Sequence, residues 1–164
     1  MFGARPNAFA TSRTLRFGLS WGHSRIVEDS WYWSYVGDRA DETAPVRRHV
    51  RRFLESRADA ERSDLDAAEL VVGELLANAV RHGAPPFGIC VDWQDDPPIL
   101  CVVDRGEGML PVYAAPGPQS ERGRGLLLVR ALAGEVIVDA PSADRSGTRV
   151  IVALPVQRNT SRAA

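Results

Sequence analysis

The stretch Glu69-Leu-Val-Val-Gly-Glu-Leu-Leu-Ala-Asn-Ala-Val-Arg-His-Gly83 indicates the fold more strongly than any other part of the sequence. Its apolar residues recur at helical spacing, which predicts a helix that starts near Ser63 or Asp64 and ends at His82. Acidic residues in the first turns favour the positive end of the helix dipole, and Gly83 suits the position after the last turn. Ala84-Pro85-Pro86 then prevents the helix from continuing.

Two polar side chains interrupt this apolar helix. Glu74 and Asn78 are four residues apart, so they share one face. A helix edge that faces water is one explanation. The other is a functional site, because a glutamate can orient or deprotonate a hydroxyl and an asparagine carbonyl oxygen is a ligand that Mg²⁺ accepts. The residues alone leave both explanations open.

The sequence around this helix predicts strands and two further helices. Before it, Trp31–Val36 alternates in the manner of a strand, and Thr43 and Pro45 open a helix that continues to about Ser56. After it come strands at 88–93 and 99–103, a helix at 125–133, and strands at 135–140 and 148–154. Strands and helices do not alternate in this order. The prediction is therefore an α+β fold: a two-layer sandwich with a mostly antiparallel sheet and helices packed on one face.

The length of 164 residues suggests one domain with an extension at each end. Residues 1–28 show no clear periodicity and are interpreted as a flexible leader or extension. Residues 29–156 are assigned to the domain, and residues 157–164 to a polar tail.

The basic residues exclude several kinds of chemistry. All 20 are arginines, so the chain has no lysine for a P-loop, for the third strand of a eukaryotic-type protein kinase or for a pyridoxal phosphate Schiff base. The formal net charge of -1 argues against a general nucleic-acid binder.

The sequence predicts neither a membrane span nor a secretory signal. No apolar run approaches the roughly 18 residues that a span needs, and the first 20 residues lack a continuous apolar region. Cys90 and Cys101 lie in apolar segments, where reduced and buried cysteines are expected. We therefore expect a cytoplasmic protein.

Three glycine-containing motifs follow the helix. Asp104-Arg105-Gly106-Glu107-Gly108 comes directly after an apolar strand, so its first carboxylate can accept hydrogen bonds from an exocyclic amine, and its glycines let backbone approach a ligand. Gly123-Arg124-Gly125-Leu126 opens a helix whose N–H groups suit phosphate, with Arg122 and Arg124 adding positive charge. Gly147-Thr148 begins the last strand and offers a hydroxyl. Taken singly, each motif is also explained by an ordinary turn, a loop or a strand start.

With the Glu74–Asn78 helix, these motifs resemble the N-box, the two glycine boxes and the terminal Gly-Thr of the GHKL ATPase superfamily, which has the Bergerat ATP-binding fold. The resemblance covers about residues 40–155. Within the superfamily, the quoted helix, the segment 121–133 and the arginine-rich first helix resemble those of the stand-alone anti-sigma factor serine/threonine kinases.

The resemblance implies a role for each motif residue. Glu74 matches the general base, Asn78 the Mg²⁺ ligand and Asp104 the carboxylate that binds the adenine amine of ATP. The other matches are the glycines of the base pocket, the glycines around the phosphates and a threonine that helps to hold adenine: Gly106 and Gly108, Gly123 and Gly125, and Thr148. Residues 109–122 match the lid over ATP, and Arg124 is a candidate phosphate contact.

Two functions of different classes follow from the resemblance. In the first, the protein is a kinase that uses ATP to phosphorylate an anti-sigma factor antagonist and alternately holds a sigma factor. In the second, it binds ATP without phosphoryl transfer and regulates by capturing a partner. No histidine lies in a phosphoacceptor helix, which argues against a complete histidine kinase.

The resemblance also implies a homodimer, because stand-alone members of this branch commonly dimerise. The arginines of the first helix are either a solvated face or a surface that meets a partner. They are Arg47, Arg48, Arg51 and Arg52.

Overall fold

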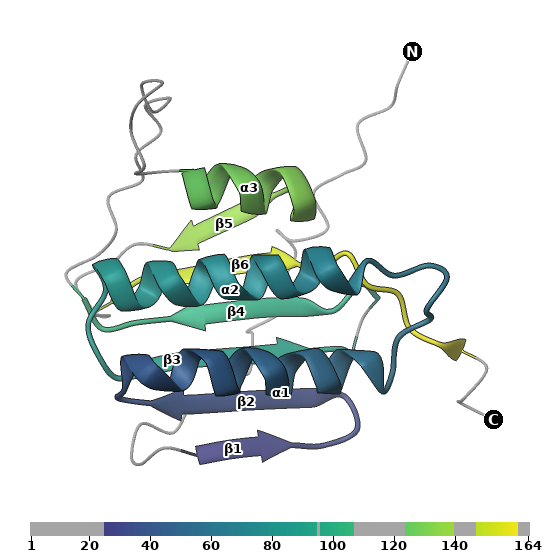
Figure 1. Ribbon diagram of the computed structural model, residues 1–164, viewed down its shortest axis with the longest axis horizontal. Helices are drawn as coiled ribbons and strands as arrows, with labels where there is room; N and C mark the ends of the chain where they lie inside the picture. The colour runs from purple at the N-terminus through teal and green to yellow at the C-terminus, as the bar shows by residue number, and fades with distance from the viewer. Residues whose placement is uncertain (1–24, 95, 107–123, 140–146, 161–164) are drawn as a thin grey trace.

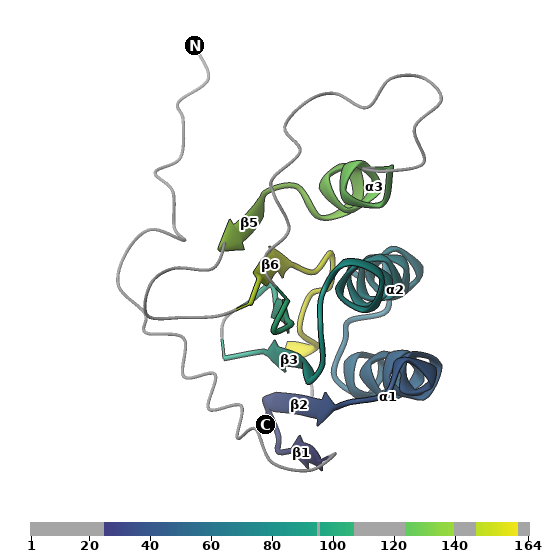
Figure 2. The ribbon, with the colours of Figure 1, turned by 90° about the vertical axis from the view of Figure 1, so that its left-hand side faces the viewer.

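The computed structural model describes residues 25–94, 96–106, 124–139 and 147–160. Its six strands form one sheet in the order β1-β2-β3-β4-β6-β5, and each neighbouring pair is antiparallel. Helices α1, α2 and α3 all lie on one face of the sheet (Figure 1), which is clearest when the sheet is seen from its edge (Figure 2). The predicted α+β two-layer sandwich is confirmed.

The eight predicted helices and strands are all present, with their ends shifted by at most two residues. In chain order the elements are β1 (Arg25–Glu28), β2 (Tyr32–Gly37), a short 3-10 helix η1 (Ala40–Glu42), α1 (Thr43–Glu55), α2 (Leu65–His82), β3 (Phe87–Asp92), β4 (Ile99–Val103), α3 (Arg124–Ala133), β5 (Val136–Asp139) and β6 (Arg149–Ala153).

Strand β1 was not predicted, because its residues fall in the segment interpreted as a leader. It pairs with β2 from Arg25, opposite Val36, to Glu28, opposite Trp33. Ile26 is 46% exposed and Val27 42%, so the strand lacks the alternating burial that a sequence pattern reports. Arg25–Glu28 therefore belong to the sheet rather than to an extension.

The first residues of the predicted polar tail also belong to the folded domain. The backbone N–H of Asp59 donates to the carbonyl of Gln157 at 2.9 Å, and the N–H of Asn159 donates to the carbonyl of Arg57 at 2.9 Å. The chain after β6 is thereby fixed to the connection between α1 and α2. These bonds are made by backbone groups, which composition does not reveal.

The two long helices begin differently. Thr43 was expected to cap the N-terminus of α1, and this prediction is wrong. The helix η1 leads directly into α1, and the Thr43 hydroxyl donates to the carbonyl of Ala40 at 3.1 Å. In α2, the Asp64 carboxylate accepts a hydrogen bond from the N–H of Ala67 at 2.9 Å, as an N-cap does. α2 has 18 residues, and no helix in the described ranges combines the length and apolar character needed to cross a membrane.

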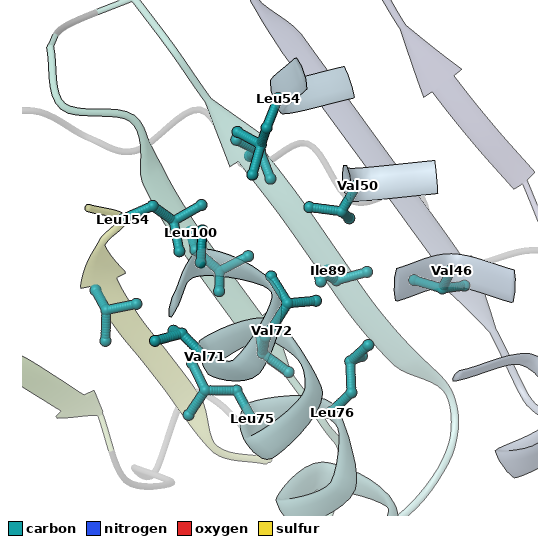
Figure 3. Close-up of a cluster of buried hydrophobic side chains, with 14 of the residues drawn as sticks. Val46, Val50, Leu54, Val71, Val72, Leu75, Leu76, Ile89, Leu100 and Leu154 are labelled. Atoms are coloured by element: carbon teal, nitrogen blue, oxygen red, sulfur yellow. The ribbon is translucent and has the colours of Figure 1, made fainter. Parts of the chain in front are cut away.

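One apolar layer holds α1 and α2 against the sheet. Side chains of both helices point toward β3, β4 and the end of β6 (Figure 3). Each of the ten side chains labelled in Figure 3 is at most 5% exposed, and burial of one such side chain contributes about 1.5–3 kcal/mol. The labelled members are Val46, Val50, Leu54, Val71, Val72, Leu75, Leu76, Ile89, Leu100 and Leu154. This packing fixes which side of α2 faces the sheet.

Two of the four α1 arginines hold α1 to α2. Arg51 Nη1 lies 2.7 Å from a carboxylate oxygen of Asp66 and 3.1 Å from one of Glu69, and Arg47 Nε lies 3.3 Å from Glu69. Arg48 and Arg52 are exposed, so for them both the solvated face and the partner surface stay open.

Candidate functional site

The side chains of Glu74 and Asn78 face the first turn of α3, which lies beside α2 (Figure 2). A Cβ placed on Gly125 would lie 3.5 Å from Asn78 Nδ2 and 3.5 Å from Glu74 Cδ, and it would collide with Glu74 Oε2. The lack of a side chain at Gly125 thus lets α3 approach both polar groups closely. The structure brings together three residues that the sequence assigned to one site.

The Glu74 carboxylate differs from the other acids on α2. Asp66 and Glu69 are paired with arginines of α1. Among the described residues, no hydrogen bond or ion pair engages the side chain of Glu74 or Asn78, and both residues are partly buried. A partly buried carboxylate without a partner is able to accept a proton or a ligand hydrogen bond.

A second group of predicted residues meets at the end of β4. Asp104 is 9% exposed, and its Oδ1 accepts a hydrogen bond from the N–H of Gly106 at 2.8 Å. Its own backbone N–H donates to the carbonyl of Thr148 at 3.0 Å. The N–H of Arg105 donates to the carbonyl of Ala84 at 2.9 Å. Asp104 is therefore held where the end of β4, the start of β6 and the loop after α2 come together.

The environment of Asp104 changes its acidity. Burial raises the pKa of the Asp104 carboxyl above its usual 3.8, and hydrogen bonds with the backbone of Gly106, Thr148 and Ala84 oppose that rise. A shifted carboxyl fixed by backbone groups is typical of a functional site, and it is a preorganised acceptor for a ligand N–H.

Two glycines to which the sequence analysis gave no role in the site pack directly on Asp104. Gly83 follows the last turn of α2 as expected, but its φ of -97° is not left-handed. A Cβ there would lie 2.6 Å from Asp104 Cβ and 2.6 Å from the carbonyl oxygen of Ala79. Gly147 has a φ of +87°, and a Cβ there would lie 2.7 Å from the Asp104 carbonyl carbon. Both glycines belong to motifs that the sequence analysis quoted, but only the folded chain shows that they contact Asp104.

The two groups of residues lie at different positions along the C-terminal half of α2. Gly83 contacts Asp104 at the C-terminal end, and Glu74, which contacts Gly125, lies nine residues earlier. At the helical rise, nine residues correspond to about 13 Å. Arg124 is exposed in the first turn of α3, next to Gly125, which contacts Glu74. This spacing suits an elongated ligand with an amine-bearing group at one end and anionic groups at the other.

The remaining predicted residues divide into those that the structure places and those that it does not. Gly106 lies beside Gly83 and Asp104, where an added Cβ would lie 2.9 Å from Gly83 Cα. Thr148 is 2% exposed and bonded to Asp104 through its backbone. Gly108, Gly123, Arg122 and the predicted lid at 109–122 lie outside the described residues.

The donors near Asn78 suit a hard cation that is shared with a ligand. In the part of the chain that the structure describes, no group of three His, Cys, Asp or Glu side chains could hold a metal. Asn78 offers one amide oxygen, which is a ligand type that Mg²⁺ accepts alongside phosphate oxygens and water. The residues present therefore fit Mg²⁺ that arrives with a phosphate ligand.

Comparison with known families agrees with this geometry. A family model described as the histidine kinase-like ATPase domain matches residues 37–154. The matched range begins at the end of β2 and ends just after β6, so it includes both ends of α2 and all the site residues described above. A comparison with curated proteins finds no match. The chain therefore belongs to the histidine kinase-like ATPase domain family, a GHKL-type family whose domain binds ATP.

Proposed function

We propose that this ATP-binding regulatory protein is a serine/threonine kinase that phosphorylates an anti-sigma factor antagonist and alternately holds a sigma factor. The observation that carries the kinase proposal is the Glu74 carboxylate, which faces the first turn of α3 and has no hydrogen-bond or ion-pair partner among the described residues. Asn78 lies one turn further along α2. The class of partner rests on the resemblance of the α2 and α3 sequences to those of the anti-sigma factor kinases.

ATP would lie along α2, with its base at Asp104 and its phosphates at α3. The buried Asp104 carboxylate accepts a hydrogen bond from the adenine amine. The backbone N–H groups in the first turn of α3 and the Arg124 guanidinium are suited to phosphate oxygens. Asn78 would hold Mg²⁺, which neutralises charge on the phosphates.

In the transfer step, Glu74 takes the proton of the acceptor serine or threonine hydroxyl. The hydroxyl oxygen forms a bond to the γ-phosphorus of ATP, and the bond from that phosphorus to the bridging oxygen breaks. ADP leaves with the electron pair of the broken bond. Phosphoryl transfer depends mainly on positioning and charge neutralisation, which the α2 and α3 residues supply.

The test is transfer of labelled γ-phosphate from ATP to purified candidate antagonist proteins. Glu74→Gln keeps the size of the side chain but removes the proton acceptor, so we expect the initial rate to fall by about 10²–10⁴-fold with little change in ATP affinity. Glu69→Gln is the matched control, because Glu69 lies on the same helix but pairs with α1. It should transfer phosphate at the wild-type rate.

Two results would contradict parts of the proposal. Equal transfer by the wild type and Glu74→Gln would exclude Glu74 as the base. A wild type that binds ATP and captures antagonists without labelling any of them would favour the non-catalytic partner-switching module instead.

A further inference from the structure

The only two cysteines of the chain lie directly opposite each other on neighbouring strands. β3 carries Cys90, β4 carries Cys101, and the register of this antiparallel pair of strands matches one with the other. Both are free and buried, as the sequence analysis expected. Their pairing was not expected, because the register between two strands is not visible in the composition of either one.

The two side chains lie on the same face of the sheet. Side chains alternate along a strand, so Ile89 and Leu100 pack beneath the helices while Cys90 and Cys101 point to the opposite face. Side chains of directly opposed residues on antiparallel strands are neighbours on one face. The two thiols are therefore adjacent.

A hydrogen bond just after β4 shows which kind of cross-strand pair the cysteines form. The N–H of Asp104 donates to the carbonyl of Thr148, which lies on the β6 side of β4. Backbone groups alternate in direction along a strand, so those of Cys101, three residues earlier, point toward β3. Cys90 and Cys101 are thus a hydrogen-bonded pair, and the Cα atoms of such a pair lie about 5.5 Å apart.

This Cα separation is suitable for a disulfide. The Cα atoms of disulfide-bonded cysteines usually lie about 4.4–6.8 Å apart, most often about 5.5–6 Å. The Cβ atoms of directly opposed residues lie about 4.5–5.5 Å apart, and a disulfide needs about 3.5–4.5 Å. Closing the bond therefore requires the two side chains to approach each other by only about 1 Å.

The surroundings of the two cysteines determine how they react. Burial raises the pKa of the Cys90 thiol, and the Cys101 side chain raises it further, which shows that the two side chains interact. A raised pKa leaves little reactive thiolate at neutral pH, so oxidation is slow. Both cysteines are 0% exposed, so the oxidant has to be small, as hydrogen peroxide is.

We propose that Cys90 and Cys101 are a reversible oxidation site, at which a peroxide converts the two thiols into one disulfide between β3 and β4. One thiol is first oxidised to a sulfenic acid, and hydrogen peroxide is reduced to water. The sulfur of the second thiol then attacks the sulfenic sulfur. The S–S bond forms, the S–O bond breaks, and the hydroxyl group leaves as a second water with the proton of the thiol. A dithiol reductant restores both thiols by exchange.

The disulfide would join two strands that lead to the Asp104 end of the candidate site. β4 continues directly into Asp104, three residues after Cys101. β3 follows the loop whose Ala84 carbonyl accepts a hydrogen bond from the N–H of Arg105. Oxidation would thus place a reversible covalent link close to this end of the site.

The test is oxidation of the folded, full-length chain by hydrogen peroxide without denaturant, read by mass spectrometry after the free thiols are blocked. Trypsin releases both cysteines in one fragment, residues 82–105, because the chain has no basic cleavage site between Arg81 and Arg105. A second cleavage before Asp92 falls between the cysteines. We expect the two pieces to stay joined, with a mass about 2 Da below the sum of the reduced pieces, and to separate after reduction with dithiothreitol.

A variant with one displaced cysteine is the matched control. Cys101→Ala/Val103→Cys moves the second thiol two residues along β4 and keeps it on the same face. The Cα atoms of positions 90 and 103 are then diagonal neighbours, about 7–8 Å apart, which a disulfide does not bridge without movement of the backbone. We expect this variant to form the bond at least tenfold more slowly than the wild type, and equal rates would overturn the proposal.

Three results with the wild type would also overturn the proposal. The first is a folded protein in which no link between the two pieces forms. The second is a disulfide that joins two chains instead of two strands of one chain. The third is a link that forms only when denaturant is present. These measurements need no variant, so they test the proposal even where the displaced variant fails to fold.

Discussion

At the scale of single residues, Asp104 is the residue that we propose to bind the adenine base. Its carboxyl is buried at a junction of three segments, and Gly83 and Gly147 pack so closely on it that no side chain fits at either position. Burial penalises the ionised carboxylate, so the ligand-free fold carries an electrostatic cost that a hydrogen bond from a ligand amine can offset.

This cost predicts a pH dependence of stability. Because the pKa of Asp104 in the folded state lies above its usual 3.8, its contribution to stability is complete below that value and is lost as the pH rises through the folded-state pKa. Asp104→Asn cannot titrate. The free energy of unfolding of the wild type, relative to that of Asp104→Asn, should therefore fall as the pH rises from 3.8 through the folded-state pKa of Asp104. Above that pKa it should level off.

Denaturant unfolding of the two ligand-free proteins across the acid range gives this difference directly. A difference that stays constant, or that turns in favour of the wild type as the pH rises, would contradict the assigned environment of Asp104.

At the scale of elements, α2 serves the core on one side and the site on the other. Val71, Val72 and Leu75 pack against the sheet, while Glu74 and Asn78 face α3. The apolar side fixes the rotation of the helix, and this rotation decides where the polar pair points. Gly73 and Gly125 lie on helices of this region, but their surroundings differ.

The two glycines predict opposite outcomes on substitution by alanine. In Gly125→Ala the added methyl group would displace the flexible end of Glu74, so we expect the fold to persist and phosphoryl transfer to fall at least tenfold.

In Gly73→Ala the methyl group meets Arg47 at 3.5–3.6 Å, an ordinary contact, and the helix gains about 1 kcal/mol in propensity. Its melting temperature should rise by about 2–4 °C with transfer unchanged. Thermal melts and the labelled-phosphate assay check both variants, and full activity in Gly125→Ala would contradict the proposed contact.

The elements were predictable where burial is periodic. α2 was found from its apolar spacing, and β4 was predicted with the bounds that it has. β1 was missed because Ile26 and Val27 are both exposed, so its four residues carry no alternating burial. Alternation of apolar and polar residues in a sequence reflects which side chains are buried. An exposed edge strand buries few side chains, so its sequence shows no such alternation.

The site was only partly predictable. From the residues alone, Glu74 and Asn78 were also explained by a helix edge that faces water, and only the resemblance to a family implied a role for the pair. The packing of Gly83 and Gly147 on Asp104 joins segments that are distant in the chain. Such a contact depends on which strand ends meet, and local composition does not specify that.

At the scale of the whole molecule, the site joins the two layers of the sandwich. The proposed base end lies where the sheet meets the C-terminal end of α2, and the proposed phosphate end lies between α2 and α3 within the helix layer. The chain has no lysine, and none of the residues in the proposed ATP site is one. In the proposed site the Asp104 carboxylate binds the base, and backbone N–H groups and arginine are available to the phosphates.

Calorimetric titration of ATP and GTP into the wild type and Asp104→Asn tests the ATP site most directly. Adenine presents an amine where guanine presents a carbonyl oxygen, so a carboxylate at Asp104 favours ATP and repels GTP. We expect the wild type to bind ATP at least tenfold more tightly than GTP. Asp104→Asn should weaken ATP binding by about tenfold to a hundredfold, which is the effect of losing a hydrogen bond to a charged group. It should also reduce the ratio of the affinity for ATP to the affinity for GTP. Unchanged ATP affinity and unchanged preference in Asp104→Asn would contradict the assignment of Asp104 to the adenine pocket.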